Sequence, residues 1–534
     1  MLQYFPVKKT AKKGIVYLVG AGPGDIGLLT VKGMRCLQRS EVVIYDFHLN
    51  AQILNYINHK AEFIYAGKRG GHHTMTQDEI NAAIVAKAEE GKIVCRLKGG
   101  DPFIFGRGGE EAQVLHAAGI PFEVVPGVSS SVAAPAYAGI PLTHRQYSSS
   151  FAVIPGYEDT TKESSAIDWT KLATGVGTLV FLMAVKNIQD LAAKLIENGR
   201  KPDTPVAVVR WGTRADQTTL ISTLDRVAAQ VREQDIRPPA VMVVGEVVRL
   251  REELNWFERK PLFGHRVMVT REHSGGFEPL EDLGAEILQF PTIEIAPPAS
   301  WRQLDAAVRN IGSYDWMILT SANGVHSFFE RLFAKGIDIR ELKGLKVCAV
   351  GSKTAEAVNR YGIVVDLVPE EFNAEGLIKA ILKLKQKTPS KTRKTKDPRP
   401  LRGMSFLLPR AEVGRELLPE TLRALGAHVD VPVAYRAVKP ELHGRRLRRF
   451  LKEGRITIAT FTSAATFTNF REIMGSEADD LLRDVAIAVI GPVTKKAVEK
   501  AGMTVAIMPK KATIGALVQE ITEWALGRAT RRPG

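Results

Sequence analysis

The sequence LKGGDPFIFGRGGEE, residues 97–111, decides how the first half of this 534-residue chain is expected to fold. It follows a short apolar run that is typical of a buried strand, and its first two glycines let the backbone approach a ligand closely. Asp101 comes next and can accept hydrogen bonds from hydroxyl groups. A plain turn would need neither the three further glycines nor the apolar pair Phe103 and Phe105, which we expect to be buried. The stretch therefore predicts a binding loop at the carboxyl end of a strand.

Strands and helices alternate on both sides of this loop. Apolar runs typical of strands occupy residues 14–20, 41–46 and 93–97, and helical patterns occupy residues 28–39, 77–91 and 109–119. A second series of the same kind begins near residue 151. This alternation predicts an α/β fold with largely parallel sheets, in which ligands bind at the carboxyl ends of the strands.

A second glycine loop, GAGPGD at residues 20–25, also follows a strand. A dinucleotide-binding fingerprint would need glycine at position 25, where this chain has Asp25, which would repel a pyrophosphate. Pro23 also lacks the backbone N–H that a pyrophosphate would use. Asp46, at the end of the next strand, is the one feature that would suit the ribose of NAD. The glycine spacing therefore disfavours the alternative of an NAD-dependent dehydrogenase.

The second half of the chain repeats itself. VMVTRE, which contains Arg271, recurs as FLLPRAE with Arg410, 139 residues later. LTSANGVHSFF recurs as FTSAATFTNF after 142 residues, and VCAVGSKTAEAV recurs as IAVIGPVTKKAV after 140 residues. Three segments in one order at nearly one spacing indicate a duplicated α/β unit. We expect such a unit to place equivalent loops on opposite sides of a cleft.

Composition limits the class of protein. Hydrophobic residues make up 45% and charged residues 25%, which is typical of a soluble globular chain. The three cysteines lack the spacing of a disulfide framework or a metal site, so we expect no metal and a reducing cytoplasm. No apolar stretch approaches the roughly 20 residues of a membrane span, so we expect no membrane partner.

The net charge of +15 is unevenly distributed. Residues 383–402 carry nine Lys or Arg and one acid, so over half of the excess charge lies in one polar stretch between the two repeat copies. No aromatic residues are interleaved there to stack on bases. We therefore favour a solvated basic loop, and a basic nucleic-acid-binding protein is a disfavoured alternative.

Six segments of the first half resemble uroporphyrinogen-III C-methyltransferases of the tetrapyrrole methylase family. They are VYLVGAGPGD, YDFH, GKRGG, RLKGGDPFIFGRGGEE, PGVSSSVAAPAYAGIPLTHR and LNWF, in this order, within about residues 14–257. The resemblance implies two α/β domains, about residues 14–138 and 139–257, with S-adenosyl-L-methionine in the cleft between them. It also implies a homodimer formed through this half.

The same resemblance assigns residues. Those that match the family's cofactor-binding positions are Pro23, Gly99, Gly100, Asp101, Ile104, Ser129, Ser130, Met183 and Gly212. Asp46 and Lys68 match its proposed acid–base pair, which would move a proton as aromaticity is restored. Arg107 is one of several basic residues that could hold substrate carboxylates, although taken singly a surface salt bridge is the more ordinary role. Two methyl transfers would give precorrin-2, and whether this product goes to sirohaem or cobalamin stays open.

Six segments within residues 265–528 resemble uroporphyrinogen-III synthases. They are VMVTRE, LTSANGVHSFFERL, CAVGSKTAEAV, VPVAYRAV, FTSAATFTNF and IAVIGPVTKKAVEKAG. This family has two α/β lobes joined by two strands, with the active site in the cleft between the lobes. The resemblance implies, after a linker at residues 258–264, one lobe from about residues 265–296 plus 438–528 and another from about 297–437.

Residues at the strand ends would line this second cleft and bind substrate carboxylates, partly through helix N-termini. They are Arg271, Thr320, Ser321, Gly351, Thr354, Thr462, Ser463, Gly491 and Thr494. The serines are equally suited to cap helices. Tyr435 matches the tyrosine proposed to assist loss of the hydroxyl group from hydroxymethylbilane, and packing at the lobe junction is its alternative role. Together the halves imply a bifunctional enzyme that makes uroporphyrinogen III, with ring D inverted, and then methylates it.

We expect the basic loop at residues 383–402 to be dispensable for both reactions. Replacing it with a neutral linker of equal length should leave kcat/KM of the synthase within about twofold, because insertions between the repeat copies cost little closure entropy. Kinetics at low and high salt test this expectation. A tenfold fall at low salt that disappears when the Debye length is about 8 Å would show instead that the loop attracts the polyanionic substrate.

Overall fold

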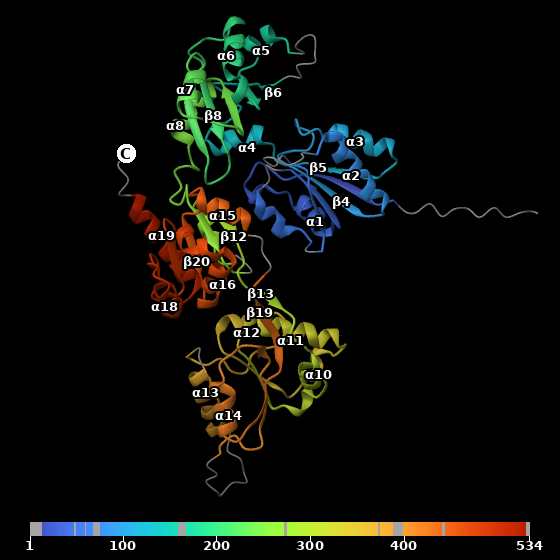
Figure 1. The fold of residues 1–534 in the computed structure, drawn as a ribbon, viewed down its shortest axis with the longest axis vertical. Helices are drawn as coiled ribbons and strands as arrows, with labels where there is room; N and C mark the ends of the chain where they lie inside the picture. Colours follow the sequence, from blue (N-terminus) through green and yellow to red (C-terminus); the bar gives the residue numbers. More distant parts are fainter. Residues whose placement is uncertain are drawn as a thin grey trace, which may run out of the picture.

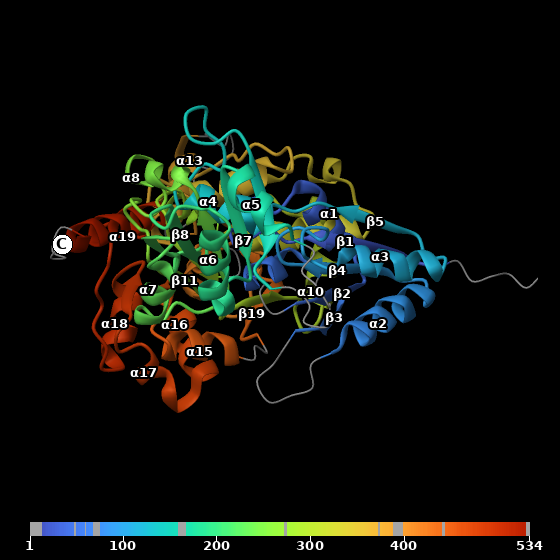
Figure 2. The same cartoon turned by 90° about the horizontal axis from the view of Figure 1, so that it is seen from above.

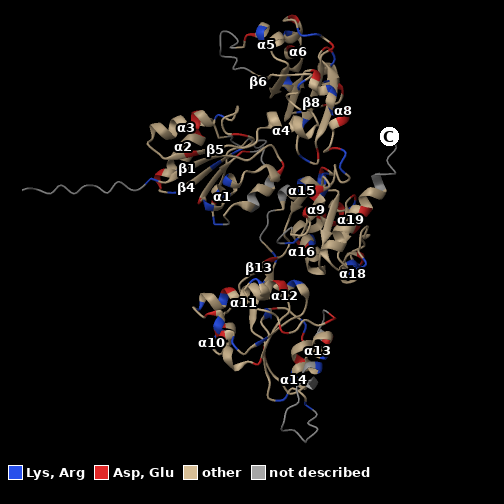
Figure 3. Cartoon of the chain, turned by 180° about the vertical axis from the view of Figure 1, so that it is seen from behind, with Lys and Arg blue, Asp and Glu red and all other residues tan. Residues whose placement is uncertain are grey.

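The computed structural model describes residues 13–46, 50–58, 60–67, 75–157, 167–271, 275–371, 374–387, 399–440 and 444–529. Four α/β bodies make up the chain, two in each half (Figure 1). In the perpendicular view of Figure 2, the N-terminal body in blue and the C-terminal helices in red lie on opposite sides of the molecule. Charges of both signs are intermixed over the outer helices of all four bodies (Figure 3).

The first body is built on a parallel sheet of order β3–β2–β4–β1–β5. Its strands are β1 (Ile15–Gly20), β2 (Val42–Tyr45), β3 (Glu62–Tyr65), β4 (Ile93–Lys98) and β5 (Phe122–Val125). α1 (Val31–Arg39) covers one face, and α2 (Gln77–Glu89) and α3 (Gly108–Ala117) cover the other. Because both faces are covered, the central strands are buried and mostly apolar, with Arg96 and Lys98 of β4 as the exceptions. Parallel pairing also brings the loops after β1, β4 and β5 to one edge of the sheet.

Two reciprocal hydrogen bonds define the start of α2. The hydroxyl of Thr76 accepts a hydrogen bond from the backbone N–H of Glu79, and the Glu79 carboxylate accepts one from the backbone N–H of Thr76. This reciprocal arrangement is a capping box, which stabilises a helix N-terminus.

The second body has a mixed sheet of order β6–β7–β10–β8–β9. Its strands are β6 (Phe151–Pro155), β7 (Thr178–Leu182), β8 (Pro205–Arg210), β9 (Thr218–Thr223) and β10 (Ala240–Val244), and only β6 and β7 pair in parallel. The expectation of a largely parallel sheet is wrong here, because a short loop without a crossover helix joins β8 to β9. α4 (Ser130–Tyr137) covers one face, and the other is covered by α5 (Trp169–Gly175), α6 (Ile188–Glu197) and α7 (Val227–Glu233).

The third body combines the two ends of the second half of the chain. After α8 (Arg251–Leu254), its parallel sheet has the order β12–β11–β20–β21 and consists of β11 (Arg266–Val269), β12 (Glu286–Gln289), β20 (Ile458–Phe461) and β21 (Ala486–Val489). Its helices are α9 (Glu278–Asp282), α15 (Arg445–Lys452), α16 (Ala464–Met474), α17 (Ala478–Leu481), α18 (Pro492–Lys500) and α19 (Ile514–Ala529). The sheet is therefore completed by strands from far apart in the sequence.

The fourth body is inserted between those ends. Its parallel sheet of order β15–β14–β16–β18 contains β14 (Trp316–Leu319), β15 (Lys346–Ala349), β16 (Ser405–Leu407) and β18 (His428–Asp430). Its helices are α10 (Arg302–Arg309), α11 (Ala322–Ala334), α12 (Ser352–Asn359), α13 (Ala374–Lys387) and α14 (Leu417–Ala424). The chain enters through β13 (Glu294–Ala296) and returns through β19 (Val433–Val438), and these strands pair antiparallel beside β17 (Arg410–Ala411) (Figure 1). The predicted bilobed α/β fold is confirmed.

The basic loop expected at residues 383–402 starts differently in the structure. α13 extends to Lys387, so the first five of these residues are helical rather than part of a loop. Leu377 and Ile381 anchor the helix in the core of the fourth body, and the good helix formers that follow continue it. Residues 388–398 lie outside the described part of the chain.

Other sequence expectations concern chemistry rather than fold. Cys36, Cys95 and Cys348 are buried and form no disulfide. Burial raises the pKa of the Cys348 thiol to about 12. Among the described residues, no three or more His, Cys, Asp or Glu side chains are grouped as a metal site would require, and no helix is long and apolar enough to span a bilayer.

Candidate functional site

Three loops at the carboxyl ends of β1, β4 and β5 touch one another. Gly22 and Gly100 exchange two backbone hydrogen bonds, of 3.2 and 2.8 Å. A Cβ added to Gly127 would lie 2.3 Å from the carbonyl oxygen of Gly100, and one added to Gly20 would lie 2.5 Å from the Gly127 nitrogen. Backbone contact therefore requires glycine at positions 20 and 127. We call the three loops, residues 20–25, 99–107 and 126–129, the glycine cradle.

Two polar side chains of the glycine cradle, Asp101 and Ser129, hydrogen-bond to neighbouring backbone. Asp101 accepts hydrogen bonds from the N–H of Phe103 at 2.8 Å and of Gly127 at 3.0 Å. Ser129 caps α4, of which Ser130 is the first residue. Gly99 faces open space, because an added Cβ there would meet nothing within 4 Å. The cradle thus has an open side beside a helix N-terminus, where an anionic group is favoured.

The second body contributes two more predicted cofactor residues. Met183 follows β7 with its side chain 55% exposed and a φ of 59°, and Gly212 follows β8. A Cβ on Gly212 would lie 2.5 Å from the Cβ of Ala134 on α4. Since α4 starts in the glycine cradle, this helix joins the Gly212 loop to it. Pro23 lies within the cradle, and its role and those of the other cofactor residues stay predictions.

The expectation that Phe103 and Phe105 are buried is wrong. Their side chains are 56% and 45% exposed, and Ile104 between them is 42% exposed. The reason is the tight return of the loop, since a Cβ on Gly108 would lie 2.5 Å from the carbonyl oxygen of Pro102. The loop leaves the sheet edge and returns to α3 without covering its own apolar side chains, which are therefore free to contact a ligand.

A buried ion cluster lies beneath the cradle. Arg96, 2% exposed, donates from Nη2 to Asp46 at 2.8 Å and from Nε to Glu111 at 3.0 Å. Lys98 reaches the same Glu111 oxygen at 2.8 Å. Burial alone would lower the pKa of Arg96, but the carboxylates of Asp46 and Glu111 outweigh it and raise the pKa. Burial, followed by the charge of Arg96, lowers the pKa of Lys98.

This cluster holds Asp46 in place at the end of β2, with about a third of its side chain exposed. Lys68, its predicted partner, lies outside the described residues. Sequence reasoning missed Arg96, Lys98 and Glu111. A signal was available, because two cations within an otherwise apolar strand must find a partner when they are buried.

Arg107 forms a surface salt bridge. Its side chain is 56% exposed and pairs with Glu110 one helical turn ahead, with an Nε–Oε1 distance of 3.0 Å. The hydrogen bonds to Glu110 raise the pKa of this guanidinium. The structure thus displays the more ordinary of the two roles considered for Arg107, and contact with substrate carboxylates stays a prediction.

In the second half, Tyr435 lies where β19 joins the two lobes. Its side chain packs in the core of the fourth body and is 9% exposed, while its hydroxyl lies 3.0 Å from the Ser321 hydroxyl. Ser321 caps α11 and accepts from the backbone N–H of Gly324 at 3.0 Å. Both roles considered for Tyr435 are therefore compatible: the ring packs, and the phenol is hydrogen-bonded at a helix N-terminus.

Ser463 is the repeat counterpart of Ser321 and caps α16 in the other lobe through a capping box. Thr320 is exposed, Thr462 and Gly351 are half-buried, and Gly491 is buried. Thr354 and Thr494 are 6% and 2% exposed, and each lies on the first turn of its helix. Contact of these residues with substrate stays a prediction.

The two repeat arginines differ in their partners. Arg410 is ion-paired with Glu416 and also donates to the carbonyl of Arg415 at 2.7 Å. Arg271 is half-buried, and no carboxylate among the described residues pairs with it. Burial lowers the pKa of Arg271, as expected for a partly desolvated cation. Within the described part of the chain, Arg271 thus differs from Arg410 in having no carboxylate partner, and its contact with a substrate carboxylate stays a prediction.

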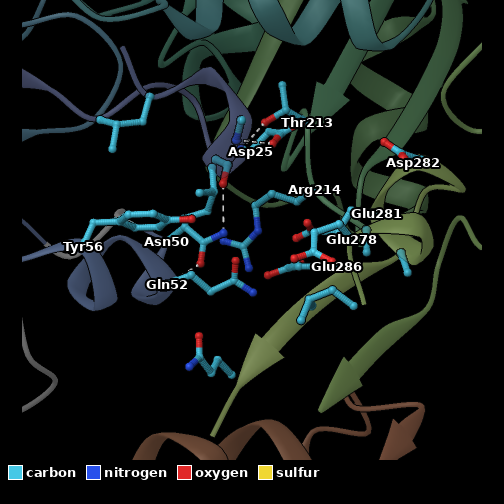
Figure 4. A pocket seen from close by; sticks show the side chains of 18 of the residues that line it. Asp25, Asn50, Gln52, Tyr56, Thr213, Arg214, Glu278, Glu281, Asp282 and Glu286 are labelled. Carbon is cyan, nitrogen blue, oxygen red and sulfur yellow. Dashed lines mark hydrogen bonds between the residues drawn. The ribbon is translucent and has the colours of Figure 1, made fainter. Parts of the chain in front are cut away.

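A cavity of about 1230 Å³ lies where the two halves of the chain meet (Figure 4). Its charged lining comprises six carboxylates and two cations: Asp25, Glu278, Glu281, Asp282, Glu286, Glu294, Arg214 and Lys260. Burial, reinforced by the charge of Asp25, raises the pKa of Glu281 to about 7. An acidic lining of this kind disfavours a polyanion, so this cavity is distinct in chemistry from the open glycine cradle.

The architecture defines two enzyme domains in one chain. The sequence model of the tetrapyrrole (corrin/porphyrin) methylase family matches residues 15–228, and the sequence model of the uroporphyrinogen-III synthase HemD family matches residues 277–519. We call residues 13–257 the methylase half and residues 265–529 the synthase half.

Similar proteins cover both halves. The chain is 37% identical over 513 residues to the porphyrin biosynthesis protein HemD of Ruminiclostridium josui, which covers 96% of this chain and 98% of that relative. The chain therefore belongs to the family of this HemD protein, in which a methylase and a synthase domain are joined. It is 53% identical over 241 residues to an S-adenosyl-L-methionine-dependent uroporphyrinogen III methyltransferase of Methanosarcina barkeri, covering 45% of this chain and 94% of the relative. A solved uroporphyrin-III C-methyltransferase of Thermus thermophilus with S-adenosyl homocysteine is 39% identical, with a TM-score of 0.39, over 44% of this chain and 100% of that one.

Substitutions at two glycines of the cradle should affect stability and cofactor binding separately. Gly127→Ala should destabilise the methylase half by roughly 1–3 kcal/mol, because its Cβ would overlap the Gly100 carbonyl. Gly99→Ala should leave thermal stability unchanged, yet weaken binding of S-adenosyl-L-methionine about tenfold or more by filling the open side. Thermal melting and calorimetric titration measure the two effects. Equal affinity of Gly99→Ala and wild type would show that the cofactor does not use the open side.

Proposed function

We propose that this chain makes uroporphyrinogen III from hydroxymethylbilane in its synthase half and methylates it twice with S-adenosyl-L-methionine in its methylase half, giving precorrin-2. The observation that carries the proposal is the presence of two separate sites in one chain, the glycine cradle above Asp46 and the Tyr435–Ser321 pair at the lobe junction. The product of the second site is the substrate of the first, which accounts for their fusion.

The residues of the cradle fit S-adenosyl-L-methionine. Gly99 leaves room for a ligand against the backbone, and the amino end of α4 offers N–H groups to a carboxylate. The exposed side chains of Ile104 and Met183 would cover the apolar parts of the ligand and exclude water. When bound, S-adenosyl-L-methionine supplies an electrophilic methyl group, which needs orientation rather than activation.

Asp46 would accept the proton that the pyrrole substrate loses after the new carbon–carbon bond forms. Arg96 donates to the Asp46 carboxylate at 2.8 Å and fixes its direction, so the carboxylate is oriented before any substrate arrives. Lys68 is the predicted partner of Asp46 in this proton transfer. The alternative of an NAD-dependent dehydrogenase would instead have Asp46 bind a ribose.

In the synthase half, the Tyr435 phenol would donate a hydrogen bond to the departing hydroxyl of hydroxymethylbilane. Ser321, held by the Gly324 N–H, keeps the phenol at the N-terminus of α11. Arg271 and the loop residues around the cleft would hold the substrate's carboxylates while the chain folds back and ring D closes inverted. The reaction would then depend on the shape and charge of the cleft more than on a strong acid or base.

We further propose a cytoplasmic enzyme that forms homodimers through its methylase half and binds no nucleic acid. Support comes from composition and from exposed apolar side chains on that half, among them Val132, Tyr147, Phe151 and Tyr157. The intermediate would not cross the cavity between the halves, since a lining in which carboxylates outnumber cations by six to two disfavours a molecule with an acetate and a propionate on every ring.

Asp46→Asn should lower kcat for methylation of supplied uroporphyrinogen III by a factor of about 100 or more, while the affinity for S-adenosyl-L-methionine changes little. The fold should survive, because Arg96 keeps its bond to Glu111. Turnover assays and calorimetric titration provide the measurements, with exposed Asp78→Asn as the matched control. Loss of cofactor binding, or binding of NAD in its place, would reject the proposed role.

Tyr435→Phe should reduce formation of uroporphyrinogen III from hydroxymethylbilane by roughly tenfold or more and leave methylation of supplied substrate unchanged, because only the hydroxyl near Ser321 is lost. Tyr314→Phe is the control, since that hydroxyl binds Asp430 on another part of the same lobe. Chromatography of the oxidised porphyrin isomers gives the rate. Equal rates for both variants would assign Tyr435 to packing alone.

A further inference from the structure

A charged cluster joins the synthase half to the loop between β8 and β9 of the methylase half. Asp216 of this loop, residues 211–217, binds Nη2 of Arg455 at 2.6 Å and lies 3.4 Å from Nη2 of Arg266. Arg266 is the first residue of β11, and Arg455 lies between α15 and β20, so both belong to the synthase half. Arg214 of the same loop also approaches Asp216, with its Nε at 3.3 Å.

The cluster is too buried to be an ordinary surface ion pair. The side chains of Arg266 and Arg214 are 2% and 7% exposed, and Asp216 is 30% exposed. Burial works to raise the pKa of Asp216, but the three guanidinium groups outweigh it and hold the pKa below its ordinary value. The ring of Phe450 lies 4.3 Å beneath the Arg455 guanidinium. Removing one partner would therefore leave buried charge uncompensated.

The 211–217 loop has a strained backbone. Trp211 and Thr213 have φ values of 50° and 73°, in a region that residues other than glycine rarely adopt. For the β-branched Thr213 the conformation is especially costly, so the surroundings must impose it. Within the methylase half, Gln217 accepts from the Thr213 N–H at 2.8 Å. The ion pairs of Asp216 act on the same short segment from the synthase side.

The loop reaches the glycine cradle directly. Thr213 Oγ1 accepts from the backbone N–H of Asp25 at 3.0 Å, and an added Cβ on Gly24 would lie 2.8 Å from the Arg214 side chain. Figure 4 shows Thr213 beside Asp25 and Arg214 extending from the loop toward Glu286 of the synthase half. Gly212, a predicted cofactor residue, directly precedes Thr213. A shift at Asp216 would therefore be transmitted to the cradle through two residues of the backbone.

We infer that the synthase half positions the cofactor loop of the methylase half, with Asp216, Arg455 and Arg266 as positioning residues for S-adenosyl-L-methionine binding. The inference rests on the proposed function, because it assumes that the cradle and Gly212 bind this cofactor. The synthase half thus contributes to the methylase site without touching the reacting atoms. Its effect is on cofactor affinity rather than on the chemical step.

The test uses the full chain with Arg455→Met, Arg455→Lys and Asp216→Asn. In Arg455→Met the KM for S-adenosyl-L-methionine and the Kd for S-adenosyl homocysteine should both rise about fivefold or more, the range of ordinary coupling between sites. At saturating cofactor, kcat should stay within twofold, and synthase activity should be unchanged. Arg455→Lys should restore most of the affinity, and combining Asp216→Asn with Arg455→Met should weaken binding less than the product of the single effects.

Arg471→Met is the matched control, because Arg471 forms a two-pronged bond to Asp479, 2.9 Å for each contact, on the surface of the same lobe. It should leave cofactor affinity unchanged. If Arg455→Met and Asp216→Asn both bind cofactor as tightly as wild type, the inference is overturned while the proposed function stands. If wild type itself binds no S-adenosyl-L-methionine, the proposed function fails and the inference with it.

Discussion

The buried contact of Glu111 with Arg96 and Lys98 determines the shape of the methylase site. Glu111 lies on α3, and the two cations lie on β4, so this contact ties together the two elements between which the 99–107 loop runs. A loop with both ends fixed can keep its glycines packed against neighbouring backbone. It can also keep its apolar side chains exposed. The same Arg96 also holds Asp46, so the ligand loop and the proposed proton acceptor share one support. Desolvation makes such a cluster costly unless every charge is paired, which explains why both carboxylates accompany the two cations.

In the synthase half, the two strands that link the lobes determine where the candidate site lies. Its two lobes have separate parallel sheets and separate cores, and β13 and β19 are the strands through which the chain passes between them. Tyr435 lies on β19, with its hydroxyl at the N-terminus of α11. A site at such a junction lies between two separately packed lobes, which would suit the flexible linear substrate that we propose for this half.

Much of the fold follows from local sequence. The alternation of apolar runs with helical patterns predicted the parallel sheet of the first body, and Ser321 and Ser463 were recognisable as caps because capping depends on neighbours within three residues. The end of α13 was missed, because the charge of residues 383–387 suggested a loop. The mixed sheet of the second body was missed because nothing in β8 or β9 alone specifies the direction of pairing.

The candidate sites could be predicted only in part, since their key contacts join residues far apart in the chain. Arg96 and Glu111 are 15 residues apart and Asp216 and Arg455 are 239 apart, so neither pair leaves a local pattern. The exposure of Phe103 and Phe105 depends on a loop whose path is set by glycine contacts across it. Resemblance to known families supplied candidate residues such as Tyr435, but not the partners that hold them.

The central claim is that one chain joins cyclisation to methylation. The most direct measurement is to incubate the intact protein anaerobically with hydroxymethylbilane and methyl-labelled S-adenosyl-L-methionine, and to identify the labelled product by mass spectrometry and by the isomer type of its porphyrin skeleton. The account predicts a product of type III that carries two labelled methyl groups. A product of type I only, or a type III product without label, would contradict it.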